Sequence, residues 1–492
     1  MNARIVRNLI PAVFFAASAV AAQKAPVPAA SAATPAAGKA PVAKSTVPKA
    51  PAAKPTAAAR APLAAPAPDA APYVFTLKNG LRTTFTHTGT ERKATIALVL
   101  ESGEIDEPSF GAGLASLTAD ILLQGTVARS AKTIETETAS LGTKLSVRAG
   151  PISTTLSGDV DDARIPHFLS LVADIVRHPL LDTAGFNRVR RNALRALDSA
   201  LHNESDLAKQ HWRAIIFPDG PFGHPYAVAT TLSQLLLGHV RNVYDDNYAA
   251  RRTHLYISGV FDDAAVEAAV REIFSDWKAG DPSKPLSIHA ATVHELATID
   301  QPGAARSVTW IGLPVIDPAD VEFAKLEVAD MLLAGDDSSR VSFDIGGIDS
   351  VKPRATSTLW QRRSATYWVD AIDVKVQNTG AALGALINEI LTLQKTAPLE
   401  AELDRAKARV IAAFEARNNS REGRAGLMQF MDEHSLGDGW RTEYVKRIQA
   451  VTREDVRAAA ATYLDPQKMA IVVVGDRAVI DPQLVKLRPL IP

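Results

Sequence analysis

The stretch Gly113-Leu-Ala-Ser116-Leu-Thr-Ala119-Asp120-Ile-Leu-Leu-Gln-Gly-Thr126 decides how the rest of the chain is interpreted. Its apolar residues recur at helical spacing, which predicts an amphipathic helix from Gly113 to Leu123. Ser116 and Asp120 are four residues apart and therefore share one face of that helix, with Ala119 beside them. Serine is a poor zinc ligand, a single aspartate does not replace two imidazoles, and alanine has no acid–base function.

The same stretch resembles the zinc-helix segment of the insulinase and pitrilysin peptidases, the M16 family, which carries His-x-x-Glu-His inside a Gly-Leu-Ala…Gly-Thr frame. The frame is present here. The resemblance places the two metal-binding histidines on Ser116 and Asp120, and the catalytic glutamate on Ala119. The family's further glutamate ligand would lie within Phe186–Asp198, where Arg195-Ala196-Leu197-Asp198 contains no Glu. The resemblance therefore implies a peptidase scaffold with no catalytic residue, no metal and no cofactor.

Other histidines offer no convincing replacement for the missing zinc site. The nearest approach to a ligand cluster is His202 with Glu204 and His211, and His224 is an isolated candidate. Neither spacing matches a zinc pattern, so we interpret them as ordinary polar groups on a helix and a loop. The chain contains no cysteine, which excludes disulfides, thiol catalysis and thiolate metal sites.

The first 72 residues are predicted to be a leader followed by a tether. Residues 1–22 combine a charged start, an apolar run and small residues, as a secretory signal peptide does; an uncleaved anchor is the alternative. Residues 23–72 are rich in Ala, Pro and Lys and are predicted to be disordered. Their excess of lysine could contact anionic lipid, cell wall or an acidic partner, and a plain soluble spacer is the alternative. These features predict a periplasmic protein whose mature chain has no membrane span.

Two sequence echoes indicate that the remaining body is duplicated. Ala119-Asp-Ile-Leu-Leu-Gln-Gly125 recurs as Ala329-Asp-Met-Leu-Leu-Ala-Gly335, and the apolar run ending at Gly259 recurs as the run ending at Gly475. The shifts of 210 and 216 residues are too long for a solenoid and indicate two related domains. We place these domains at 73–280 and 299–492, with a linker at 281–298.

Each half mixes alternating strand patterns with long helices, which predicts an α+β fold class. The M16 resemblance makes this specific. It implies two tandem α/β sandwich domains, of the LuxS/metallopeptidase-like kind, that form a clam-like chamber for extended peptides. The body has no dense basic patch or finger motif, so we do not expect nucleic acid as a partner.

In some M16 pairs, a subunit without zinc supplies an Arg and a Tyr to its partner's active site. Counting from Arg340 places Gly346 and Pro353 at those positions, so this chain departs from the helper pattern as well. Arg354 or Tyr367 could substitute after a local shift; alternatively, both simply pack or face solvent. We keep Arg340 and Arg354 as candidate substrate-binding residues.

The family also binds peptide as an added strand on an exposed sheet edge. The candidate edge here is Val147–Ser157, with Ser153, Thr154 and Thr155 as candidate contacts. Main-chain hydrogen bonds would supply the affinity there. The alternative is an ordinary strand.

Three functional hypotheses follow. The first is a non-catalytic subunit that pairs with a zinc-bearing M16 peptidase, as a heterodimer, or that self-associates, and helps to bind peptide. The second is a stand-alone peptide-binding or scaffold protein of the cell envelope. The third is an active metallopeptidase with an atypical site.

Overall fold

A computed structural model describes residues 71–108, 111–200, 203–218, 222–223, 229–284, 290–291, 293–336, 339–348, 354–361 and 365–491. The predicted signal peptide and nearly all of the predicted linker lie outside these residues. Within the described ranges, no helix is both long enough and apolar enough to cross a membrane.

The N-terminal domain is built on a six-stranded mixed sheet with the strand order β1-β2-β6-β3-β5-β4. Strand β2 runs parallel to β6, and the other neighbours are antiparallel. Asn79 and Gly80 lie in the turn between β1 and β2, where Gly80 adopts a φ of 98°, as is typical of an Asn-Gly hairpin. The strands are β1 (Tyr73–Thr76), β2 (Arg82–His87), β3 (Lys93–Leu100), β4 (Ser146–Ala149), β5 (Thr154–Asp161) and β6 (Thr253–Gly259).

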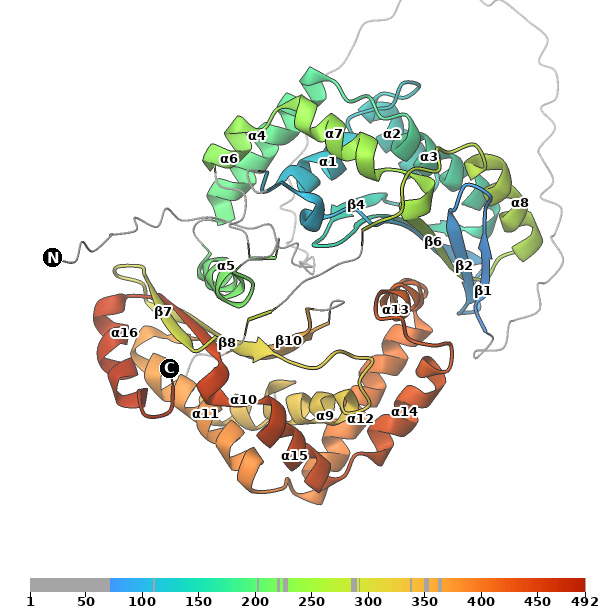
Figure 1. The fold of residues 1–492 in the computed structure, drawn as a ribbon. Helices are drawn as coiled ribbons and strands as arrows, with labels where there is room; N and C mark the ends of the chain where they lie inside the picture. Colours follow the sequence, from blue (N-terminus) through green and yellow to red (C-terminus); the bar gives the residue numbers. More distant parts are fainter. Residues whose placement is uncertain are drawn as a thin grey trace, which may run out of the picture. The chain divides into compact units, whose positions relative to one another are not determined.

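Helices form two apolar clusters around this sheet (Figure 1). Helices α3 and α8 cover one sheet face, since buried residues of both share a core with β3 and β6. Helices α1, α4 and α7 share a second cluster. The helices are α1 (Leu114–Leu122), α2 (Ala131–Ser140), α3 (Ile165–Arg177), α4 (Thr183–Ala200), α5 (Glu204–Ile216), α6 (Ala229–Gln234), α7 (Leu237–Asn247) and α8 (Asp263–Phe274).

The C-terminal domain has a five-stranded sheet with the order β7-β11-β8-β10-β9. Its strands are β7 (Glu295–Asp300), β8 (Arg306–Pro314), β9 (Arg354–Trp360), β10 (Tyr367–Lys375) and β11 (Ala470–Gly475). Helices α9, α11 and α15 share the core on one face of this sheet (Figure 1). The helices are α9 (Phe323–Ala334), α10 (Arg340–Ile348), α11 (Thr379–Lys395), α12 (Glu400–Asn419), α13 (Arg421–Glu433), α14 (Trp440–Ala450), α15 (Arg453–Tyr463) and α16 (Arg477–Leu484).

The predicted duplication is confirmed by topology. The run β2-β6-β3-β5-β4 has the same connectivity as β7-β11-β8-β10-β9, including one parallel pair at the same place. The two glycines of the sequence echo end the matching strands, with φ of 153° at Gly259 and 156° at Gly475. A Cβ at Gly259 would lie 2.0 Å from the Lys93 carbonyl oxygen, so this close approach requires glycine.

Each domain also contributes one helix to the other domain's sheet. Helix α5 packs on β8 and β11, and Trp212 on α5 donates its indole N–H to the Ala470 carbonyl at 2.9 Å. Helix α13 packs on β3 and β6, where Tyr256 donates its hydroxyl hydrogen to Asp432 at 2.7 Å. The two sheets are therefore stabilised by a reciprocal exchange of helices.

Candidate functional site

Helix α1 carries the three positions, Ser116, Ala119 and Asp120, on which the sequence resemblance places the metal ligands and the general base of a zinc peptidase. Its apolar stripe of Leu114, Leu117 and Ile121 is buried against α4 and α7. Ala119 is also buried, whereas Ser116 is half-buried and Asp120 is exposed. Ser116 and Asp120 thus share the side of α1 that the apolar cluster leaves open, as their four-residue spacing predicted.

A carboxylate from the preceding loop fixes the start of α1. The Glu107 side chain accepts hydrogen bonds from the N–H groups of Gly113, at 3.2 Å, and Ala115, at 2.7 Å. These N–H groups lack helical partners, so the carboxyl oxygens of Glu107 satisfy donors that the start of α1 leaves open. Burial raises the pKa of Glu107 to about 8. Sequence reasoning missed this cap, because Glu107 precedes the helix by several residues and matches no standard capping spacing.

Asp120 is the only acidic group among the three motif positions. Its side chain reaches solvent, but the surrounding protein removes part of its hydration and raises its pKa to about 6. Across the described residues, no group of three or more His, Asp or Glu side chains is arranged to hold a metal ion. Asp120 and Ser116 together offer one carboxylate and no imidazole, which is fewer ligands than a zinc site requires.

Helix α4 faces α1 where the family's further zinc ligand is expected. Leu197 is 3% exposed and packs into the apolar cluster shared with α1. Arg195 donates to the Asn192 side chain at 2.6 Å. Of the alternative ligands, His202 and His224 lie outside the described residues, and burial lowers the pKa of His211 on α5. At this point the described part of α4 contributes the buried side chain of Leu197 and the exposed carboxylate of Asp198, but no glutamate.

The predicted peptide-binding edge is only partly correct. Strand β4 (Ser146–Ala149) is the sheet edge, but β5 is paired on both sides, with β3 and with β4. Placing Ser153, Thr154 and Thr155 on an exposed edge was therefore wrong. The side chain of Thr154 is buried and donates to the Ser102 carbonyl at 2.8 Å, while Ser153 lies in the turn that joins the two strands. The alternating pattern predicted both strands but carried no information about which one is outermost.

Comparison with known proteins agrees with this architecture. The family profile of insulinase (peptidase family M16) matches residues 82–229, and that of the peptidase M16 inactive domain matches residues 234–410. The chain belongs to peptidase family M16. The resemblance stated from the sequence is thus confirmed, together with the two tandem domains of mixed α and β content.

The M16 relatives include proteins named as peptidases. An uncharacterized zinc protease of Rickettsia felis is 24% identical over 211 residues, which is 43% of this chain and 51% of that protein. A probable mitochondrial-processing peptidase subunit beta of Arabidopsis thaliana is 24% identical over 256 residues, 50% of this chain and 48% of that protein. The chain thus spans about half the length of these curated relatives.

Solved M16 structures share the whole two-domain plan. The crystal structure of a peptidase M16 inactive domain from Pseudomonas fluorescens has a TM-score of 0.77 at 18% identity, covering 82% of this chain and 98% of that one. A protease from Helicobacter pylori has a TM-score of 0.76 at 16% identity, with 82% and 99% covered. At these identities the comparison establishes the fold.

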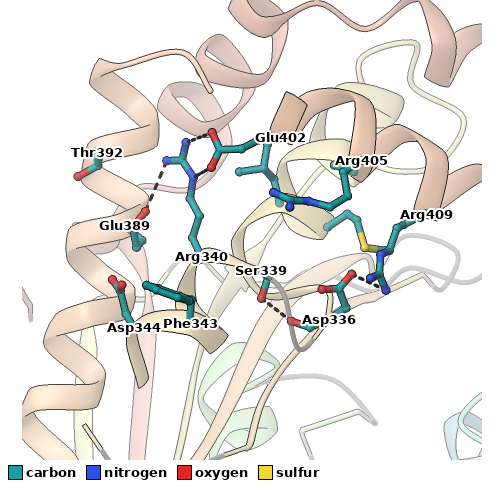
Figure 2. Close-up of a pocket in the computed structure, with 13 residues that line it drawn as sticks. Asp336, Ser339, Arg340, Phe343, Asp344, Glu389, Thr392, Glu402, Arg405 and Arg409 are labelled. Carbon is teal, nitrogen blue, oxygen red and sulfur yellow. Dashed lines mark hydrogen bonds and ion pairs between the residues drawn. The ribbon is translucent and has the colours of Figure 1, made fainter. Parts of the chain in front are cut away.

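Arg340, which the sequence offered as a candidate substrate-binding residue, is held by two glutamates. Arg340 lines a cavity of about 450 Å³, where it pairs with Glu402 at 2.9 Å and with Glu389 at 3.5 Å (Figure 2). Burial alone would raise the pKa of Glu402, but the hydrogen bond from Arg340 lowers it below its usual value. Both hydrogen-bonding sides of the guanidinium are thus engaged within the domain, so Arg340 has a structural contact where we predicted a substrate contact.

The remaining helper candidates do not form an Arg/Tyr pair. Gly346 lies exposed in α10, and Pro353 lies outside the described residues. Arg354 begins β9, and its side chain is not among those described. Tyr367 is 1% exposed and packs against Trp212 with ring centroids 4.8 Å apart, so the suggestion that it substitutes for the helper tyrosine is wrong.

Proposed function

We propose that this chain is a catalytically inactive M16 subunit, which pairs with a zinc-bearing M16 peptidase in the bacterial periplasm and helps to form the peptide-binding chamber. One observation carries the proposal. Helix α1 is held by an apolar cluster and has the Gly-Leu-Ala…Gly-Thr frame, but it carries Ser116, Ala119 and Asp120 where the resemblance places the metal ligands and the general base.

The chemistry of these residues supports an inactive role. Hydrolysis by a zinc peptidase requires three protein ligands and a base that removes a proton from the bound water. Ala119 has no acid–base group and is buried. Leu197 fills the neighbouring part of α4 with apolar contacts. Regaining the site would therefore need several simultaneous changes on two helices.

The β4 edge supports a role in positioning peptide. Among the strands of the described residues, β4 is paired only with β5, and α1 packs against it. An extended peptide added to this edge would bind through main-chain hydrogen bonds and run beside α1. Such binding depends little on side-chain identity, so it can persist after loss of the metal site.

The proposal is tested by recovering the tagged, full-length protein from its native periplasm and assaying the eluate for zinc and for peptide cleavage. Recovery of a His-x-x-Glu-His M16 protein, with cleavage that a chelator abolishes, is the expected result. A tagged, exported protein of unrelated fold serves as the control for capture by the resin. A monomeric, zinc-free protein with no M16 companion would contradict pairing.

The second candidate is a stand-alone peptide-binding or scaffold protein of the cell envelope. It is favoured by Gly346, which cannot supply the arginine that helper subunits give to a partner's active site. Saturable binding of an extended peptide by the isolated chain, without turnover, would support this candidate over the first.

A further inference from the structure

The C-terminal domain contains a cavity of about 250 Å³ between α9, α12, α13, α14 and the end of β9. Five aromatic side chains line it, and the rings of Phe414, Phe430, Trp440 and Tyr444 form a connected group. The rings of Phe414 and Tyr444 stack with centroids 4.2 Å apart, and Trp440 lies 5.0 Å from Tyr444. Faces and edges of such rings provide both apolar contact and, at a ring face, attraction for a cation.

Two carboxylates line the same cavity from one side of α9. Glu327 accepts a hydrogen bond from the Tyr444 hydroxyl at 3.0 Å. Asp330, one turn further along, accepts from the indole N–H of Trp368 at 2.8 Å and from the hydroxyl of Ser357. These donors are all neutral. Among the described residues, no Lys or Arg forms an ion pair with either carboxylate.

A third carboxyl, that of Asp370, lies near Asp330 in the core. Asp370 on β10 is 0% exposed, and neither of its oxygens has a hydrogen-bond partner. Burial, and to a lesser extent the neighbouring Asp330, raise its pKa to about 8. Burial likewise raises the pKa of Glu327 to about 7 and that of Asp330 to about 6. Buried carboxyls without a positive partner are costly, so this arrangement indicates a cation that the protein itself does not provide.

The charged side chains that line the cavity are Glu327, Asp330 and Arg417, so the lining leaves room for one more positive group. Arg417 also lines the cavity, but it is exposed and its guanidinium lies over the Phe430 ring, 5.8 Å from the centroid. It lowers the pKa of Glu327 without pairing with it. Two carboxyl groups, Glu327 and Asp330, thus line the cavity, and Arg417 is the positively charged side chain among its described lining residues.

We propose that this cavity binds an organic cation on an aliphatic stem, the ammonium or guanidinium end of a lysine or arginine side chain. The positive group would donate to Glu327 and Asp330, while the stem packs against Phe414 and Trp440. A bare metal ion fits poorly, because the described residues supply no group of three metal-binding side chains and the aromatic wall supplies none. This inference stands independently of the proposed pairing with a zinc peptidase.

The test is calorimetric titration of the full mature protein with N-acetyl-arginine methylamide and N-acetyl-lysine methylamide. The citrulline analogue, which has the same shape as arginine without its charge, is the matched neutral probe. Agmatine tests whether a free amine serves as well as a peptide-borne side chain. We expect saturable binding with a Kd below about 1 mM for the cationic probes, and at least about tenfold weaker binding for citrulline.

Substitutions locate the site. Glu327→Gln keeps an acceptor for Tyr444 but removes the charge, and we expect it to weaken binding about tenfold. Asp344→Asn, an exposed acid-to-amide change in the other cavity, should leave binding unchanged. Equal binding by wild type and Glu327→Gln, or no saturable binding of any cation, would overturn the proposal. Binding of agmatine alone would keep the site and identify a free amine as its ligand.

A second measurement needs no variant. A bound cation favours the ionised forms of Glu327 and Asp330. Binding by the wild-type protein should therefore release protons near pH 7, and the affinity should increase as the pH rises from about 6 to about 8. The charged and titratable groups that face Glu327 are Asp330 on the same helix, Tyr444 on α14 and Arg417 on α12. Titration in two buffers of different ionisation enthalpy measures the release. Binding without proton release would contradict the assignment.

Discussion

The buried carboxyl of Asp370 makes the stability of this protein depend on pH in a direction opposite to that of an ordinary paired aspartate. Its pKa is about 8 in the folded chain, whereas an unfolded aspartate has a pKa of about 4. A raised folded pKa means that the contribution to stability is complete below about pH 4 and is lost as the pH rises through about 8. The loss amounts to about 1.4 kcal/mol per pH unit, or about 2.7 kcal/mol between pH 5 and pH 7.

Replacing Asp370 by Asn removes this titration and keeps the size of the side chain. The difference in unfolding free energy between Asp370→Asn and wild type should therefore shift in favour of the variant by up to about 2.7 kcal/mol from pH 5 to pH 7. Urea denaturation followed by circular dichroism at several pH values measures it. Asp344→Asn, which changes an exposed acid in the same domain, is the control and should show no such drift. A constant difference for Asp370→Asn would mean that Asp370 is ionised in the fold, and would refute the reasoning.

Three further predictions concern α5 and α1. Trp212→Ala removes a fully buried indole from the C-terminal sheet and should lower the free energy of unfolding by about 3–5 kcal/mol in urea denaturation; a loss below about 1 kcal/mol would show that α5 is not held there. Glu107→Ala removes the cap of α1 and should lower the free energy of unfolding by about 1 kcal/mol in the same assay; an unchanged value would show that solvent replaces the carboxylate and would contradict the capping role. Zinc should leave the thermal unfolding of the wild type unchanged; a zinc-dependent shift in the wild type would contradict the proposal that α1 holds no metal.

The duplicated fold could be predicted because its signals are local. An Asn-Gly turn, alternating strands and helical stripes are visible within a few residues of one another. The echo at Gly259 and Gly475 is visible because both positions adopt a positive φ that disfavours other residues, and a close backbone approach further excludes a Cβ at Gly259. These constraints act on single positions and therefore leave their mark in the sequence.

Features set by long-range pairing could not be predicted. The side-chain period of two assigns Thr154 to a sheet face but says nothing about which strand lies outside it, so the edge was misplaced. The exchange of α5 and α13 between sheets likewise depends on partners far away in the chain, such as Ala470 for Trp212. In the sequence, Asp370 is one polar residue within an apolar strand. Only its neighbours in the folded chain show that it is a core carboxyl without a hydrogen bond.

The packing of α1 depends on residues other than Ser116 and Asp120. The residues that hold the helix in place, Leu114, Leu117 and Ile121, lie in the apolar cluster, and Glu107 fixes its first turn. Ser116 and Asp120 lie outside that cluster. A substitution at either position changes the metal site while removing none of the buried contacts, so the fold imposes no penalty on losing the metal ligands. Similarity in the frame therefore establishes the family and the fold, whereas activity depends on side chains that the packing of the helix does not constrain.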